Sequence, residues 1–286
     1  MKQSIYTIIL GVALTIMLVG CGDTQRLLKS GDNYAIYDGA MDLYEKEQWS
    51  RAATLFEAVT PYFSGTSRED SLSFYVARCR FKDRDYYEAI DKLNEFRSTF
   101  GRSAYLEDAE GMLALSYYYL SPSAERDQKN TYVAISSIEE FISRNPQSSQ
   151  IETFEKIRKE LVQKLHDKSY LNAYTYYKIG KYKSAIVALR NAMKEYPESS
   201  HREEMMYYIL RSAYELASNS IQIKETDRYL ELVDVYYSFI SEFPESKYRK
   251  DVDRMAERAK SFLERSNPDL VKDAAPQVEE IKKDKN

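Results

Sequence analysis

Apolar residues recur at every third or fourth position from Tyr34 to about residue 265. This spacing places them along one face of an α-helix, so it predicts a succession of amphipathic helices. The chain has only 9 glycines and 7 prolines, too few for the frequent turns of a β-sandwich. The sequence therefore predicts an all-α fold.

Five segments of this pattern can be aligned on one anchor position. Four neighbouring positions are mostly apolar or aromatic: the one three residues before the anchor and those one, four and seven residues after it. They fall on the same helical face as the anchor. The position twelve after the anchor is Pro or Gly in four segments, and the position fourteen after it is always Ser or Thr. The anchors are Ala52, Ala89, Ala134, Ala185 and Leu232; the residues at the fourteenth position are Thr66, Ser103, Ser148, Ser199 and Ser246.

The order of these features is that of a tetratricopeptide (TPR) repeat. A small anchor lets a partner helix approach closely, Pro or Gly ends the helix, and the hydroxyl can cap the next one. Twelve residues before the anchors stand Ala40, Ala77, Ala173 and, in the fifth segment, Ser220, while Gly180 begins a turn. We therefore expect a TPR-type helical-hairpin solenoid of about five repeats over residues 34–266. An insertion is expected at residues 121–128 and an extended helix over about 151–179.

The first 20 residues have the features of a secretory signal. Lys2 precedes an apolar run from Ile5 to Val19, and Leu18-Val19-Gly20-Cys21 resembles the lipobox of bacterial lipoproteins. The alternative, an uncleaved membrane-spanning anchor, would need a longer apolar run. We expect Cys21 to be lipidated, residues 21–33 to form a linker, and residues 267–286 to form a charged tail that is disordered or weakly helical. Without an Asp after the cysteine or an acidic run, the periplasmic face of the outer membrane is the expected location.

Together, the lipobox, five divergent repeats and an insertion in the third repeat resemble the BamD (ComL/YfiO) family of outer-membrane assembly lipoproteins. Three segments carry the resemblance beside the anchors: FSGTSRED, SPSAERDQKNTYVAI and KYKSAIVALRNAMKEYPESSHREE. The resemblance implies a non-catalytic part of the Bam machinery. Such a protein would bind the POTRA region of BamA, other Bam subunits and unfolded outer-membrane β-barrel proteins. It also implies that the N-terminal repeats recognise substrate and that the C-terminal repeats contact BamA.

In TPR arrays the first helix of each pair lines a concave groove. Aromatic residues at these positions, together with one cation, could bind an extended peptide that ends in an aromatic residue and a carboxylate. The alternative is that the rings only pack between repeats, as aromatic stripes at helical spacing often do. The candidate groove residues are Tyr37, Tyr44, Phe74, Arg78, Phe81 and Tyr118, with Tyr170 and Tyr177 at equivalent positions in the fourth repeat.

Other chemistry finds little support in the sequence. His166 and His201 lack Cys or Glu at metal-ligand spacing, so we expect two surface histidines, no metal site and no cofactor. Cys79 is expected to be a small buried residue, and no nucleophile elbow, P-loop or HExxH motif indicates an enzyme. A net charge of −4 gives no basic footprint for nucleic acid. The alternatives are a TPR lipoprotein of another envelope or secretion assembly and, less well matched in length, a SusD-like glycan-binding lipoprotein.

Overall fold

The computed structural model describes residues 23–266, and all regular structure within that range is helical, which confirms the all-α prediction. After a helical stretch at residues 23–30, the helices follow one another with short connections. They are α2 (Asn33–Glu45), α3 (Trp49–Phe63), α4 (Glu69–Lys82), α5 (Tyr86–Thr99), α6 (Leu106–Leu120), α7 (Lys129–Arg144), α8 (Ile151–Lys178), α9 (Tyr182–Glu195), α10 (Arg202–Ser218), α11 (Gln222–Glu242) and α12 (Arg249–Ser266).

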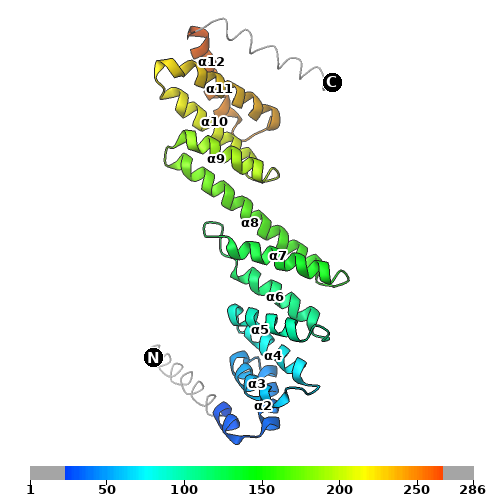
Figure 1. The fold of residues 1–286 in the computed structure, drawn as a ribbon. Coiled ribbons are helices and arrows are strands. Elements are labelled where there is room, and N and C mark those ends of the chain that lie inside the picture. Colours follow the sequence, from blue (N-terminus) through cyan, green and yellow to red (C-terminus); the bar gives the residue numbers. More distant parts are fainter. Residues whose placement is uncertain (1–22, 267–286) are drawn as a thin grey trace, which may run out of the picture. The chain divides into compact units, whose positions relative to one another are not determined.

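Helices α2 to α11 form five consecutive hairpins, α2/α3, α4/α5, α6/α7, α8/α9 and α10/α11, as the repeat pattern predicts (Figure 1). The connection between α6 and α7 contains the expected insertion, residues 121–128. Helix α8 is the expected long helix, at 28 residues.

The described chain divides into two compact units, each with its own core. The first unit comprises residues 23–122 and 127–161, and the second comprises residues 123–126 and 162–266. Helix α8 contributes its first eleven residues to the first unit and the remainder to the second.

The anchor positions are the best-buried points of the structure. All five anchor side chains have an exposed fraction of 0%. Phe56, four residues after the anchor of the first hairpin, is also fully buried. So is Phe96, seven residues after the anchor of the second hairpin. Burying a large apolar side chain of this kind contributes about 2–3 kcal/mol relative to leaving it in water. The recurring pattern therefore marks the residues that hold each hairpin together.

The four connections between hairpins and the connection from α11 to α12 are built in the same way. Each hydroxyl at the fourteenth position accepts a hydrogen bond from the backbone N–H two residues later, at 3.0–3.3 Å. The backbone carbonyl oxygen of the same Ser or Thr accepts a hydrogen bond from the N–H three residues later, at the start of the next helix. These Ser and Thr residues therefore form a hydrogen-bonded turn just before the helix and do not cap it as predicted. The N-cap residues of α4, α6 and α10 are Arg68, Tyr105 and His201, none of which makes a side-chain cap hydrogen bond.

The turns inside three hairpins share one backbone conformation. Gly180 has a φ of 72°, and the residues at the equivalent place in the first two hairpins, Glu47 and Arg84, have φ values of 57° and 64°. In each turn the N–H of the following residue bonds back to the carbonyl five residues before it, for instance Lys181 to Tyr176 at 2.8 Å. This is the left-handed ending typical of helix C-termini, which glycine adopts most easily.

The fifth hairpin differs from the prediction at its turn. Ser220 was expected inside the first helix, but α10 ends at Ser218 and Ser220 lies in the turn. Helix α11 begins ten residues before its anchor Leu232, whereas α9 begins three residues before Ala185. The small residues that α10 buries are instead Ser212, Ala213 and Ala217. The apolar pattern identified the helical face correctly, while the longer α11 shifted the turn.

Single helices cover both ends of the described chain. Helix α12 packs against α11 and α10 through Val252, Met255, Ala259 and other apolar residues. At the other end, residues 23–30 are helical where a linker was expected. There Leu27 lies so close to Gly39 that a Cβ atom on that glycine would sit 2.6 Å from a Leu27 methyl carbon.

Cys21 and residues 267–286 lie outside the described residues, as does the predicted signal at residues 1–20. Within residues 23–266, no helix combines the length and apolar character needed to cross a bilayer.

Candidate peptide-binding groove

The predicted groove residues of the first unit come from α2, α4 and α6, the first helices of three successive hairpins. Three of these residues, Phe74, Arg78 and Phe81, line one pocket of about 160 Å³. Its other walls come from the end of α4, from α6 and from the residue before α8. They are formed by Lys82, Asp108, Met112, Leu115 and Gln150. A cavity of about 150 Å³ can hold a benzene ring, so the pocket has room for one aromatic side chain.

Arg78 is the half-buried charged residue of this pocket, whereas Lys82 and Asp108 of its lining are exposed. Its guanidinium lies over two rings, 5.8 Å from the centre of Tyr44 and 5.9 Å from the centre of Phe74. Among residues 23–266 no carboxylate lies within ion-pair distance of Arg78, whereas Arg80, two residues later, is paired with Glu57 at 2.7 Å. A half-buried arginine stacked on rings and without an acidic partner can pair with a carboxylate brought by a ligand.

Phe74 itself belongs to the core. Its exposed fraction is 1%, and its ring stacks on Tyr105 at 4.6 Å and contacts Phe96 at 5.8 Å. It therefore forms the floor of the pocket and supports Arg78, with almost no surface of its own to offer a ligand. For this residue the packing alternative describes the structure better than a direct contact does.

Aromatic rings continue from Phe81 along one edge of the pocket. The ring of Tyr86 stacks on that of Tyr119 at 4.8 Å, and Phe81 lies 5.9 and 6.2 Å from these two rings. Tyr118 adjoins Tyr119 at 5.3 Å, and its hydroxyl donates to the Glu160 carboxylate at 3.1 Å. Burial raises the pKa of Tyr118, and the hydrogen bond to Glu160 raises it further. Half of the surface of Tyr119 remains exposed, so this row of rings is accessible.

Tyr44 and Tyr37 lie farther along the same unit. Tyr44 contacts the rings of Trp49 and Tyr75 at 5.2 and 5.1 Å and completes the stack under Arg78. Tyr37 instead packs near a different cation, with the Arg68 guanidinium 5.3 Å from its ring centre. The six predicted residues thus fall into three neighbourhoods: the pocket with Tyr44, the ring row with Tyr118, and the Arg68 cluster with Tyr37.

The equivalent positions in the second unit form a row of tyrosines. The rings of Tyr170, Tyr174 and Tyr177 follow one another along α8 at 5.6 and 5.8 Å, and Tyr208 of α10 contacts the last two. Burial raises the pKa values of Tyr170 and Tyr177. Tyr170 is itself a core residue, so this row combines packing with a partly exposed aromatic surface.

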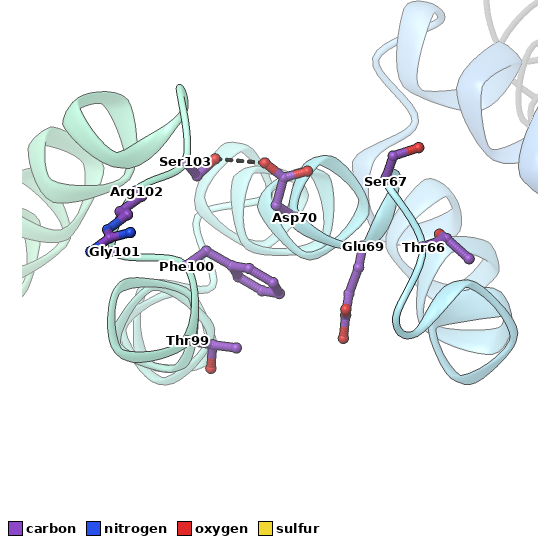
Figure 2. A pocket seen from close by; sticks show the side chains of 9 residues that line it. All are labelled: Thr66, Ser67, Glu69, Asp70, Thr99, Phe100, Gly101, Arg102 and Ser103. Atoms are coloured by element: carbon purple, nitrogen blue, oxygen red, sulfur yellow. Dashed lines mark hydrogen bonds between the residues drawn. The ribbon is translucent and has the colours of Figure 1, made fainter.

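A larger depression of about 720 Å³ lies at the turns that follow α3 and α5, and Figure 2 shows its lining. Its acidic groups have structural partners: Asp70 accepts a hydrogen bond from Ser103 at 2.8 Å, and Glu69 accepts from Ser64 and from the Gly65 backbone N–H. Phe100 is the single aromatic residue in the lining. Because its polar groups serve the turns, this depression has less to offer a peptide than the Arg78 pocket.

Several groove residues were not predicted from the sequence. Lys82 stands four residues after Arg78 on the same helix, and that spacing could have identified it. Met112 and Leu115 were hidden because the insertion obscured the register of the third repeat, and Gln150 because it precedes a helix of another hairpin.

The histidine prediction is wrong for His166. Its exposed fraction is 5%, and its ring packs on Tyr196 at 4.5 Å. The long helix α8 buries one face along its whole length, so a histidine on that face is enclosed. Cys79 is buried as expected, and burial raises its pKa to about 12. Among the described residues, no group of three or more His, Cys, Asp or Glu side chains is placed to hold a metal ion.

The fold defines a class of protein: a TPR-type helical-repeat protein, here with an aromatic surface and the Arg78 cation on one of its units. Comparison with known proteins places the chain within a family of that class. The profile of the YfiO family, described as outer membrane lipoprotein, matches residues 29–166 and 162–271. The chain therefore belongs to the YfiO family of outer membrane lipoproteins.

Two curated relatives carry the name of the outer membrane protein assembly factor BamD. One, a putative member from Aquifex aeolicus (strain VF5), is 22% identical over 199 residues, which cover 69% of this chain and 65% of the relative. The other, from Rickettsia prowazekii (strain Madrid E), is 27% identical over 111 residues, 39% of this chain and 44% of the relative. The chain thus spans less than two thirds of the length of either relative.

Solved structures of TPR proteins resemble the chain at a lower level. The TPR2AB domain of yeast Sti1, in complex with pHSP90, aligns with a TM-score of 0.37 and 14% identity, covering 79% of this chain and 98% of that one. A thermophilic TPR protein of Thermus thermophilus aligns with a TM-score of 0.31 and 15% identity, with the same coverage.

Proposed function

We propose that this protein is a non-catalytic scaffold of the β-barrel assembly machinery, of the BamD type. In this role its first unit binds the C-terminal segments of unfolded outer-membrane β-barrel proteins, and its second unit binds the POTRA region of BamA. Membership of an outer membrane lipoprotein family and two relatives named BamD support this proposal. Its location would be the periplasmic face of the outer membrane, with Cys21 carrying the lipid.

One observation supports the substrate role more than any other: the guanidinium of Arg78 lies over rings, beside an apolar pocket, without a carboxylate partner among the described residues. A peptide ending in an aromatic residue would place that ring near Phe81 and Met112 and its terminal carboxylate at Arg78. The exposed ring of Tyr119 would extend the contact to the preceding residues of the peptide. Ring burial and a charge-assisted hydrogen bond together favour such a ligand.

A direct test measures binding of a fluorescent peptide with a C-terminal phenylalanine to the full chain by anisotropy. Arg78→Gln should weaken binding about 10-fold or more, because a hydrogen bond to a charged group contributes about 1.5–3 kcal/mol. Phe81→Ala should weaken it similarly, and amidation of the peptide terminus should reproduce the Arg78→Gln effect. Arg102→Gln, at an exposed arginine of the same unit, is the matched control.

Equal affinity of the Arg78→Gln and wild-type chains, at unchanged helicity, would refute the substrate site. The partner role has a separate test: purification of the protein from detergent-solubilised envelope should recover BamA and other Bam subunits. The anchor role is tested by Cys21→Ala, which should release the protein from the membrane fraction.

A further inference from the structure

Three isoleucines of the second unit are exposed to an unusual degree. Ile179 follows the end of α8, and Ile221 and Ile223 lie at the start of α11; their exposed fractions are 60%, 66% and 83%. None belongs to a hydrophobic cluster of this unit. These side chains therefore contribute little to folding, and an exposed group of large aliphatic residues usually marks an interaction surface.

The three isoleucines stand on neighbouring turns. A pocket of about 290 Å³ lies behind these turns, between α9 on one side and α10 and α11 on the other. Its lining includes Lys183 and Val187 of α9, Leu216 of α10, and Arg228 and Glu231 of α11. Figure 1 shows the α8/α9 and α10/α11 turns on the same side of this unit, at the left in the view. Val187, also in this region, is 55% exposed.

Positive charge surrounds these apolar side chains. Residues 176–184, YYKIGKYKS, contain three lysines and no acidic residue, and Lys224 follows Ile223 directly. All four lysines are exposed, and the Lys178 ammonium lies 5.4 Å from the centre of the Tyr174 ring. The carboxylates beside the second turn are those of Glu215 and Glu225, which are half-buried, and of Asp227, which is exposed. We call this surface, made of Lys178, Ile179, Lys181, Lys183, Ile221, Ile223 and Lys224, the isoleucine–lysine tip.

This combination matches the chemistry of a lipid surface. Segments that lie at the membrane interface combine aliphatic side chains, which enter the headgroup region, with lysines that remain at the level of the phosphates. Tyrosine, present here as Tyr176 and Tyr182, is the residue type enriched at such interfaces. A lysine on a flexible stem can reach a lipid phosphate from either turn.

We propose that the isoleucine–lysine tip docks on an anionic lipid bilayer, with the three isoleucines in the headgroup region and the four lysines on lipid phosphates. This contact is separate from the lipid expected on Cys21, and it would hold the second unit at the membrane surface. The chain belongs to an outer membrane lipoprotein family, so such a surface is close to it. The lysines select negative headgroups, since each adds about fivefold to partitioning near an anionic surface.

Vesicle binding tests this proposal without the acyl anchor. A chain beginning at Asp23 keeps every described helix and lacks the apolar run at residues 5–19. In flotation it should bind phosphatidylcholine vesicles that contain about 30% phosphatidylglycerol and bind pure phosphatidylcholine at least about tenfold more weakly. Binding to the anionic vesicles should fall as salt is raised, because salt screens exposed charges.

Variants then locate the contact. Two triple variants should each reduce partitioning onto anionic vesicles at least about tenfold. One combines Ile179→Ser, Ile221→Ser and Ile223→Ser, and the other combines Lys178→Gln, Lys181→Gln and Lys183→Gln. Because all of these side chains are exposed, the variants should keep wild-type helicity and unfolding. Matched controls are Tyr87→Ser, at an exposed residue near the start of α5 in the first unit, and Lys156→Gln with Lys159→Gln, at two exposed lysines of α8. Neither control should change partitioning.

An environment-sensitive dye at position 223, attached through Ile223→Cys, should shift to the blue with anionic vesicles; Cys79 does not interfere because it is buried. Three results would each overturn the proposal. In the first, the protein binds neutral and anionic vesicles equally well. In the second, the triple isoleucine variant partitions onto vesicles like the wild type. In the third, that variant loses a protein partner while it still binds vesicles.

Discussion

The first, second and fourth hairpins share one turn conformation. Substitutions at its equivalent positions should therefore change the stability of the protein in opposite directions, depending on whether glycine is introduced or removed. Glu47, Arg84 and Gly180 all have left-handed backbone, with φ between 57° and 72°. The Cβ atom of a non-glycine residue crowds the backbone in this conformation, whereas glycine does not. We therefore expect Glu47→Gly and Arg84→Gly to stabilise the protein and Gly180→Ala to destabilise it.

Two effects decide the magnitude. Removing the left-handed penalty gains about 1–2 kcal/mol, and the greater freedom of glycine in the unfolded chain costs about 0.5–1 kcal/mol. The net gain is therefore about 0.5–1 kcal/mol for each of the two substitutions, and the loss for Gly180→Ala is about 1 kcal/mol. No hydrogen bond or ion pair of the Glu47 side chain to another described residue is lost in the exchange. A gain of this size raises Tm by about 1–4 °C in a chain of this length.

Urea unfolding followed by two signals measures the effect in each unit. Trp49, the single tryptophan, lies in the first unit against Tyr44 and reports Glu47→Gly and Arg84→Gly by fluorescence. Circular dichroism reports Gly180→Ala. Glu45→Gly is the control, because Glu45 is the last residue of α2 and a glycine there should destabilise by about 1 kcal/mol. Destabilisation by Glu47→Gly, or stabilisation by Gly180→Ala, would refute the reasoning.

Other predictions follow from buried polar groups. Arg144→Met should cost about 1–3 kcal/mol in urea unfolding, since Glu110, 5% exposed, then loses its 2.6 Å partner; adding Glu110→Gln should recover part of the loss. His166→Phe should gain about 1 kcal/mol, because neither ring nitrogen has a hydrogen-bond partner among the described residues; a loss of stability would contradict this. Cys79, with its pKa raised to about 12, should resist a thiol reagent at pH ~8 until urea unfolds the chain. Burial also raises the pKa of Tyr236 to about 12. The stability that the neutral phenol contributes is therefore complete below pH ~10 and is lost as the pH rises towards 12. Tyr236→Phe should reduce the fall in the free energy of unfolding over this pH range.

The hairpin architecture was predictable because it depends on residues that repeat. Anchors such as Ala89 and Ala134 must be small and enclosed in every hairpin, and hydroxyls such as Ser199 must stand at the same distance after them. These requirements are local, so spacing along the chain records them. The position of a hairpin turn is less constrained, which explains why the α10/α11 turn was misplaced around Ser220.

For the candidate groove, the sequence predicted only which helical face its residues occupy. Sequence spacing placed Arg78 and Phe81 on the groove side of α4, and the structure brings both to one pocket. It could not show that Tyr37 lies beside Arg68, or that Tyr118 donates to Glu160, because these partners are 31 and 42 residues away and depend on how hairpins pack. Phe74 illustrates the same limit: its position on the face is right, but Tyr105 of the next hairpin covers it.

Residues that folding does not explain are the ones that point to function. An arginine beside a packed core is ordinarily paired with an acid, as Arg80 is with Glu57, yet Arg78, two residues before it on the same helix, rests on rings alone. An isoleucine is ordinarily enclosed, yet Ile223 is 83% exposed. In both places a common local rule is broken without a structural gain, as it also is at Arg68, Ile179 and Ile221. We propose that a binding partner supplies the missing contact in each case, a carboxylate for Arg78 and a lipid surface for Ile223. The two proposed sites lie in different units, so each can be removed without disturbing the other.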